Sequence, residues 1–383
     1  MSRRKKSKAV PVVLIITVLA AALAAGCFLV KPLITDPIRK ASAADLKKRQ
    51  DQVNQENVQI MADYSAAITE LQNQKAVAPS NPAWPEHKSE GLDVIDLSNY
   101  PLENQTASTM TRADLMAGGM LLLNEWHSRP ADFDDSKVTS VGKYLGGNTK
   151  VQVSDYNVSL FPVASDALMQ AIEAARAEGL EHYLVSEGYR SWETQNANFQ
   201  KRMEKLSSRY SGEALIAATK KEVNYPGTSE FNSGLSFTLR LYEKGNAETG
   251  NAKYSTTEQA KWMNRNCWKY GLVFRFPQSG WPLPETQDKS FKTGVSVQLN
   301  LYRYVGKGNA AVMHFYDFCM EEYIEFLQEH PHIAVFEDGV LKYEIYRQYV
   351  GDAPSFNVQL TRSCRTYSSS LDNMGAVITV FEY

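Results

Sequence analysis

Residues 226–238 read PGTSEFNSGLSFT and lead directly into a predicted strand at 235–241. Upstream, residues 186–191 read SEGYRS and follow a predicted strand at 183–185. Downstream, residues 301–306 read LYRYVG and precede a long predicted helix. The three segments therefore lie where predicted strands and helices meet turns, which is where functional side chains tend to be placed.

These segments resemble the signature blocks of the VanY-like zinc D-Ala-D-Ala carboxypeptidases, which trim peptidoglycan stem peptides. In that family, a Ser-x-His-x-x-Gly-x-x-x-Asp block supplies two zinc ligands. A Glu-x-x-His block, shortly before an Arg-Tyr-Val-Gly run, supplies the general base and the third ligand. The resemblance covers roughly residues 121–327. It implies an α+β fold in which helices pack on an antiparallel sheet.

The first block keeps its frame in this chain, but both ligand positions hold other residues. Ser229 and Gly234 match the Ser and Gly of the family. This match puts Phe231 at the His position and Thr238 at the Asp position. Phenylalanine has no lone pair to donate to a metal, and a neutral threonine hydroxyl is a poor substitute for a carboxylate.

The second block departs from the family in the same way. Residues 303–306 read RYVG, and counting back from them puts Leu301 at the third ligand and Gln298 at the general base. A glutamine amide does not accept a proton near neutral pH. Without zinc, the pKa of water stays far above neutral instead of falling to about 7. We therefore expect that zinc is lost, that no catalytic residue is intact and that the protein is a pseudoenzyme.

Other family positions are retained. Arg190 and Gln195 match a Ser-Gly-Tyr-Arg-Ser…Gln motif, with Glu187 as an additional or substituted residue. In the family this arginine faces the terminal carboxylate of the substrate, a task that suits a guanidinium fork. Ser229 also matches a substrate-side position. Either these residues bind substrate, or Arg190 and Gln195 hold the turn and the start of the next helix.

The resemblance leaves three functions open. The protein can be an inactive relative that binds a peptidoglycan stem peptide or a cell-envelope protein in the cleft that binds substrate in the family. It can be an active D,D-carboxypeptidase with a rearranged metal site, or a scaffold that acts through its stalk and β tail. Histidine spacing does not predict a new metal site. The six histidines are His87, His127, His182, His314, His330 and His332. We expect His330 and His332 to lie in a solvated loop, and either His127 or His182 to lie near the cleft.

The N-terminal region predicts a membrane anchor. Residues 1–8 contain five Lys or Arg, and residues 9–30 contain no charged residue. At about 1.5 Å per residue, a helix over this apolar stretch spans about 33 Å, enough to cross a bilayer. The basic head predicts a cytoplasmic N-terminus and an extracytoplasmic C-terminal domain in a single-pass membrane protein. A cleaved signal peptide, or a lipoprotein site at Cys27, is the alternative.

Charge and cysteines constrain the partners and the chemistry. The chain has a net charge of −2, and because the head contributes +5, the remainder carries −7, which argues against nucleic acid as a partner. Cys267, Cys319 and Cys364 show no C-x-x-C spacing, so a zinc site built from sulfur is not expected. Cys267–Cys319 is the disulfide that we expect, since both residues flank elements of the same predicted core; separately buried thiols are the alternative.

The remaining sequence divides into four regions. Residues 41–74 contain no Pro or Gly and predict a helical stalk. Its seven-residue repeat places polar as well as apolar residues along one face, which favours a solvated helix, with a weak homodimer as the alternative. Residues 75–91 form a polar linker with three prolines. Residues 92–330 are expected to form the VanY-like domain. Residues 333–383 are expected to form a small β appendage of three or four strands, with a tight turn at Asp338.

Overall fold

A computed structural model describes residues 91–147, 151–295 and 297–383, together with seven helical positions between 44 and 59. The chain divides into two units, Met1–Trp84 and Pro85–Tyr383. The predicted head and membrane span lie outside the described residues, as do most of the stalk and the linker. None of the helices that the structure describes is both long and apolar enough to cross a membrane.

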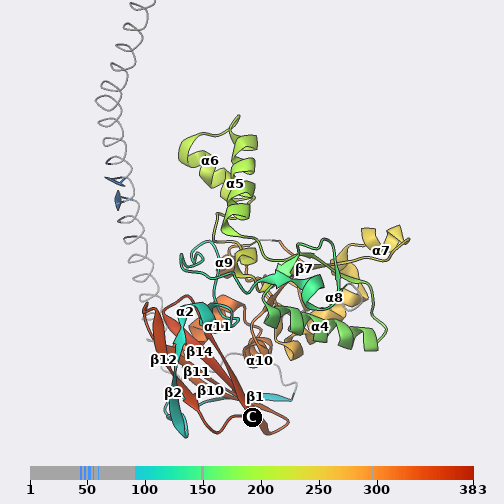
Figure 1. Cartoon of the computed structure of the whole chain (residues 1–383). Coiled ribbons are helices and arrows are strands. Elements are labelled where there is room, and N and C mark those ends of the chain that lie inside the picture. Colours follow the sequence, from blue (N-terminus) through green and yellow to red (C-terminus); the bar gives the residue numbers. More distant parts are fainter. Residues whose placement is uncertain are drawn as a thin grey trace, which may run out of the picture. The chain divides into compact units, whose positions relative to one another are not determined.

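The first layer of the C-terminal unit is a five-stranded sheet in the order β4-β6-β7-β9-β8. Its neighbouring strands are antiparallel except for the parallel pair β4–β6. Helices pack on this sheet around one apolar core (Figure 1), so the predicted antiparallel sheet with packed helices is confirmed. The strands are β4 (Gln152–Val153), β6 (Tyr183–Glu187), β7 (Ser236–Leu241), β8 (Leu272–Phe274) and β9 (Leu301–Tyr304).

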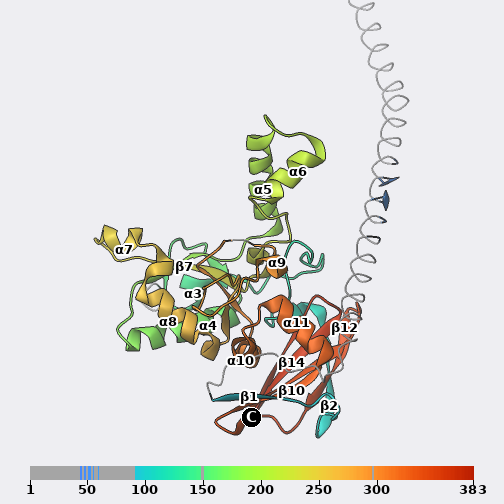
Figure 2. The same ribbon diagram turned by 180° about the vertical axis from the view of Figure 1, so that it is seen from behind.

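The helices of this layer begin and end at the residues that their sequence favours. Helix α4 (Pro162–Ala177) starts with proline at its first turn, and it buries one face that includes Leu168 and Ile172. The side chain of Thr257 accepts from the backbone N–H of Ala260, which caps α8 (Glu258–Asn266). Ser191 caps α5 (Trp192–Leu206), whose partner is α6 (Gly212–Lys220). In Figures 1 and 2, α5 and α6 form a hairpin that projects from the sheet.

The second layer is a β-structure built from both ends of the C-terminal unit. A five-stranded sheet has the order β1-β10-β11-β14-β13, and β12 pairs with β2. Helix α10 (Lys307–Tyr316) contacts β8 on one side and strands β10, β11 and β14 on the other (Figure 2). The strands are β1 (Leu92–Asp96), β2 (Gln105–Thr111), β10 (His332–Glu337), β11 (Val340–Tyr349), β12 (Ser355–Thr361), β13 (Thr366–Leu371) and β14 (Ala376–Glu382).

This pairing departs from the predicted division at residues 330–333. The tail contributes five strands rather than three or four, and the segment that follows Gly91 supplies two more. Strand β1 pairs with β10 along its whole length, from Leu92 opposite Glu337 to Asp96 opposite Ile333. A sheet edge exposes unpaired backbone groups, and β1 covers this edge. The predicted hairpin is present, with positive φ at both Asp338 and Gly339.

Two further expectations differ from the structure. The helix expected over 308–329 is two helices, α10 and α11 (Met320–Glu329), because the chain adopts a left-handed conformation at Asp317. Cys267 and Cys319 are free, separately buried thiols, so the predicted disulfide is not formed. Cys267 belongs to the core beneath the first sheet, whereas Cys319 caps α11.

The remaining elements are short and connect the two layers. They are the helices α2 (Arg112–Met116), α3 (Val141–Tyr144), α7 (Ala247–Asn251) and α9 (Ser290–Thr293), the paired strands β3 (Thr139–Ser140) and β5 (Ser159–Leu160), and the 3-10 helices η1 (Glu230–Ser233), η2 (Tyr254–Thr256) and η3 (Cys267–Tyr270).

Candidate functional site

The 3-10 helix η1 places Phe231 at the start of β7. It ends at Gly234, whose φ of 70° is left-handed. A Cβ at Gly234 would lie 2.9 Å from the Phe161 ring, so glycine is required at this turn by both conformation and space. The backbone N–H of Arg190 donates to the carbonyl oxygen of Phe231 at 2.9 Å. The turn after β6 and the turn before β7 are thus tied together.

Phe231 and Leu301 lie in one small apolar cluster. The third buried member is Phe276, and the half-buried Val295 packs against the three. Leu301 is fully buried, and Phe231 is 6% exposed. The two positions that the sequence resemblance aligns with zinc-binding histidines therefore hold hydrocarbon side chains that pack as a core does.

Thr238 lies beside this cluster. It is the partner of Leu301 in the antiparallel register of β7 and β9. Its hydroxyl forms a hydrogen bond of 2.9 Å with the hydroxyl of Ser186. On the other side of β7, Thr238 is the register partner of Glu187. The position that the resemblance aligns with the Asp ligand thus holds a hydroxyl that is hydrogen-bonded to a neighbouring hydroxyl.

Gln298 is half-buried in the loop between α9 and β9. It lies three residues before Leu301, in a segment without regular secondary structure. The structure thus brings Phe231, Thr238 and Leu301 together, whereas Gln298 lies in the loop that precedes β9.

Arg190 covers the apolar cluster. Its guanidinium carbon lies 4.2 Å from the centroid of the Phe231 ring, which is a cation–π arrangement. One guanidinium nitrogen donates to Gln195 Oε1 at 3.3 Å, and another forms an ion pair with Glu187. The arginine that the family directs at a substrate carboxylate is therefore already held by a carboxylate of its own chain.

Gln195 and Asn232 brace the turn that carries Arg190. Gln195 is 1% exposed, and its amide donates to the carbonyl of Asn224 at 2.8 Å. The Asn232 amide donates to the carbonyl of Arg190 at 2.7 Å. Ser229 is buried just before η1. Gln195 therefore holds the turn, which is the role that the sequence analysis left open as the alternative to substrate binding. It also contacts Arg190.

A buried charge cluster lies directly behind Phe231. Glu230 Oε1 is 2.5 Å from Arg275 Nε, and Glu230 Oε2 is 2.8 Å from Arg303 Nη1. Arg275 also pairs with Glu321 at 2.7 Å, and the Ser236 hydroxyl donates to Glu230 at 2.7 Å. Burial alone would raise the pKa of Glu230, but the two guanidinium groups outweigh burial and lower this pKa.

This cluster connects the two layers and was missed at the sequence level. Arg303 donates to the backbone carbonyls of Gly119 and Leu121, and Glu321 comes from α11. The available signal was a charged residue inside an apolar strand: Arg275 lies between two phenylalanines, and Arg303 lies between two tyrosines. Such residues are buried only when they are paired.

The five histidines within the described residues do not gather at the site, and His87 lies outside those residues. His182 precedes β6, at the opposite end of this strand from Glu187, and lies 3.8 Å from Glu243. His127 lies beside Asn124, where burial lowers the pKa of its imidazole. His314 stacks on Trp268. His332 was expected in a loop, but it is buried in β10 and pairs with Glu344.

The residues at the family positions do not fit a zinc ion. Phe231 and Leu301 offer no lone pairs, and Thr238 offers one neutral hydroxyl. Among the residues that the structure describes, no group of three or more His, Cys, Asp or Glu side chains could hold a metal. The chemistry left at this place is apolar contact, with one arginine at the rim.

Comparison with known proteins identifies the family. Residues 157–306, which contain Arg190, Phe231, Thr238 and Leu301, match the VanY family of D-alanyl-D-alanine carboxypeptidases. A D-alanyl-D-alanine carboxypeptidase from Enterococcus faecium is 26% identical over 73% of this chain and 80% of its own length. A D-alanyl-D-alanine carboxypeptidase from Enterococcus faecalis strain V583 is 28% identical over 62% of this chain and 76% of its own length.

A solved structure agrees at the level of the fold. The vancomycin-resistance D,D-dipeptidase VanXYg, in complex with a D-Ala-D-Ala phosphinate analogue, matches 73% of this chain and 99% of its own with 21% identity and a TM-score of 0.53. Residues 157–306 are thus a VanY-like carboxypeptidase domain.

Proposed function

We propose that this protein is a membrane-anchored, inactive relative of the D-alanyl-D-alanine carboxypeptidases that binds a peptidoglycan stem peptide in the old cleft. One observation carries the proposal. Phe231 and Leu301, which the resemblance places at two zinc-ligand positions, pack together with Phe276. An apolar cluster of this kind neither binds a divalent cation nor activates water.

The retained arginine supports a binding role. Arg190 lies at the rim of the apolar cluster with its side chain 28% exposed, and its pairing with Glu187 is an exposed one. Exposed ion pairs contribute little stability, so an incoming carboxylate can displace Glu187 at small cost. The apolar floor suits the methyl groups of alanine residues. A protein partner with a free C-terminal carboxylate would meet the same groups.

Membrane attachment is the second part of the proposal, and it comes from the sequence. The uncharged stretch at 9–30 and the basic head before it favour a single-pass anchor with the C-terminal unit outside the cell membrane. This location places the cleft where peptidoglycan stem peptides are found.

The test uses the full-length chain in a neutral detergent. Release of D-Ala from a pentapeptide that ends in D-Ala-D-Ala is measured with and without added zinc, and binding of the same peptide is followed by calorimetry. We expect no release, and we expect binding that Arg190→Ala weakens but Arg209→Ala does not. Arg209 is the matched control, an exposed arginine that does not line the cavity next to Arg190.

Two results would overturn parts of this proposal. Zinc-dependent release of D-Ala would show an active carboxypeptidase with a rearranged site. Absence of binding in the wild type would leave the cleft without a role and would favour the scaffold function of the stalk and β tail.

A further inference from the structure

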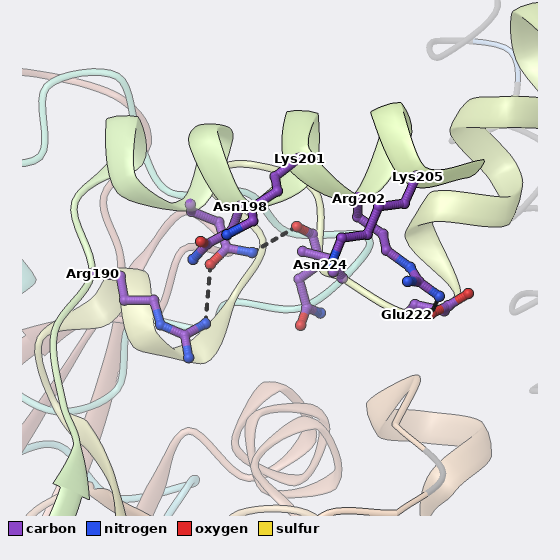
Figure 3. Close-up of a pocket in the computed structure, with 9 residues that line it drawn as sticks. Arg190, Asn198, Lys201, Arg202, Lys205, Glu222 and Asn224 are labelled. Carbon is purple, nitrogen blue, oxygen red and sulfur yellow. Dashed lines mark hydrogen bonds and ion pairs between the residues drawn. The ribbon is translucent and has the colours of Figure 1, made fainter. Parts of the chain in front are cut away.

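A polar cavity of about 320 Å³ runs along one face of α5, on the far side of Arg190 from the apolar cluster. Figure 3 shows its wall, with Arg190 at one end and Lys205 at the other. Helix α5 contributes Asn198, Lys201 and Lys205, and the segment after α6 contributes Asn224 opposite them. The cavity is therefore an elongated groove rather than a deep hole.

The helix repeat explains why basic side chains line this groove. Residues 198, 201, 202 and 205 recur at intervals of three and four, so they lie on one face of α5. Lys201 and Lys205 are one helical turn apart, which separates their backbones by about 6 Å. The groove thus presents cations at regular spacing along its length.

Two of the four cations that line the groove have no ion-pair partner among the described residues. Arg202 pairs with Glu222, and Arg190 pairs with Glu187. Lys201 and Lys205 are exposed, and neither takes part in an ion pair within residues 91–147, 151–295 and 297–383. Two ammonium groups thus remain available to a ligand from solution.

The whole α5–α6 hairpin departs from the charge of the protein around it. Residues 192–224 contain six Lys or Arg and four Glu, so this hairpin carries +2. The chain outside its N-terminal head carries −7. A local positive groove on an acidic surface attracts an anion to that one place. It offers too few cations for a nucleic acid duplex.

The free groups also indicate which kind of anion fits. Carboxylates are recognised best by the planar fork of arginine; within the groove Arg202 pairs with Glu222, and Arg190, at the end of the groove, is the group proposed above for the carboxylate of the stem peptide. The groups left over are lysines, which bind phosphate as point charges. The Asn198 and Asn224 amides add hydrogen-bond donors along the wall.

We propose that the groove along α5 binds a linear polymer that carries phosphate groups, with successive phosphates at Lys201 and Lys205. This site is separate from the apolar cleft, and it goes beyond the stem-peptide function. The polymer would tether the projecting hairpin to a phosphate-rich surface. Because the groove is open and its free cations are solvated, binding should weaken strongly with salt.

The experiment measures binding of a fluorescein-labelled linear polyphosphate to the full-length protein by anisotropy. The five cations at residues 3–8 are changed to Gln in every protein compared, because the basic head would otherwise bind the probe. Lys201→Gln with Lys205→Gln is the test variant. Lys244→Gln with Lys253→Gln is the matched control, since both of these lysines are exposed and lie outside the groove.

We expect the test variant to weaken binding about tenfold or more at low salt and to reduce the slope of log K against log salt by about two. The control should bind as the starting protein does. A second measurement, amine acetylation followed by mass spectrometry, should show that polyphosphate protects Lys201 and Lys205 but not Lys244.

Three results would overturn the proposal. The first is that polyphosphate does not bind, and the second is that its affinity falls equally in the test and control variants. The third is that a poly-glutamate peptide binds as tightly as polyphosphate or more tightly, which would make a carboxylate-rich peptide the occupant. None of these results bears on Arg190 and the D-Ala-D-Ala peptide, so the two proposals fail independently.

Discussion

Removal of the charge of Glu230 should destabilise the C-terminal unit more than most single substitutions. Glu230 has a side chain that is 3% exposed, and it pairs with Arg275 and Arg303, whose side chains are fully buried. Glu230→Gln keeps the shape of the side chain but leaves two guanidinium groups with one carboxylate, that of Glu321. Loss of one partner from a buried ion pair costs about 3–5 kcal/mol, because the remaining charge stays out of water.

The assay is urea unfolding of the full-length protein, followed by tryptophan fluorescence and far-UV circular dichroism at pH 7. Glu258→Gln serves as the control, because Glu258 pairs with Lys261 on the surface of α8. Surface pairs contribute about 1 kcal/mol or less. The unfolding midpoint should therefore fall strongly for Glu230→Gln and hardly at all for Glu258→Gln.

The pH dependence gives the same prediction an independent readout. The pKa of Glu230 in the folded protein is lowered from 4.5, so its contribution is present above this value and is lost as pH falls through the folded pKa. The stability difference between wild type and Glu230→Gln should be constant near neutral pH and should shrink in acid. If Glu230→Gln costs no more than Glu258→Gln at pH 7, the account of this cluster is wrong.

Three other predictions follow from the same structure. Leu301→Ala should lower the free energy of unfolding in urea by about 2–5 kcal/mol, because it opens a cavity in a packed cluster. Val297→Ala, at a side chain that is 71% exposed, should hardly change this free energy. Equal effects of the two substitutions would contradict the packing. Burial raises the pKa of the Cys267 thiol to about 12, so iodoacetamide at pH 8 should label this residue only after unfolding, and rapid labelling of the native protein would count against the core assignment. Burial lowers the pKa of His332, but its hydrogen bond to Glu344 outweighs burial and raises this pKa above 6.5. The thermal destabilisation caused by His332→Gln should therefore be fully present below pH 6.5 and should decline as pH rises through the folded pKa. A pH-independent effect would refute the pairing.

The sequence predicted the first layer well because its signals are local. The strands predicted at 183–185 and 235–241 are present as β6 and β7, because the apolar residues that mark each strand are neighbours in the chain. The family frame around Ser229 and Gly234 also predicted which positions meet, and Phe231 and Leu301 do pack together.

The features that sequence reasoning missed depend on residues far apart in the chain. Strand β1 could not be assigned to the tail, because nothing in residues 92–96 specifies a partner at 333–337. The pairing of Glu230 with Arg303 joins residues 73 positions apart. The expected disulfide failed for the same reason: flanking elements of one core did not bring Cys267 and Cys319 together.

The proposed lack of carboxypeptidase activity depends most on hydrocarbon side chains occupying the positions of the zinc ligands. Equilibrium dialysis of the full-length protein against zinc, with a competing chelator and elemental analysis, tests this claim most directly. We predict no stoichiometric tight zinc in the wild type. One tightly bound zinc ion per chain, lost on substitution of residues next to Phe231 and Leu301, would contradict the account.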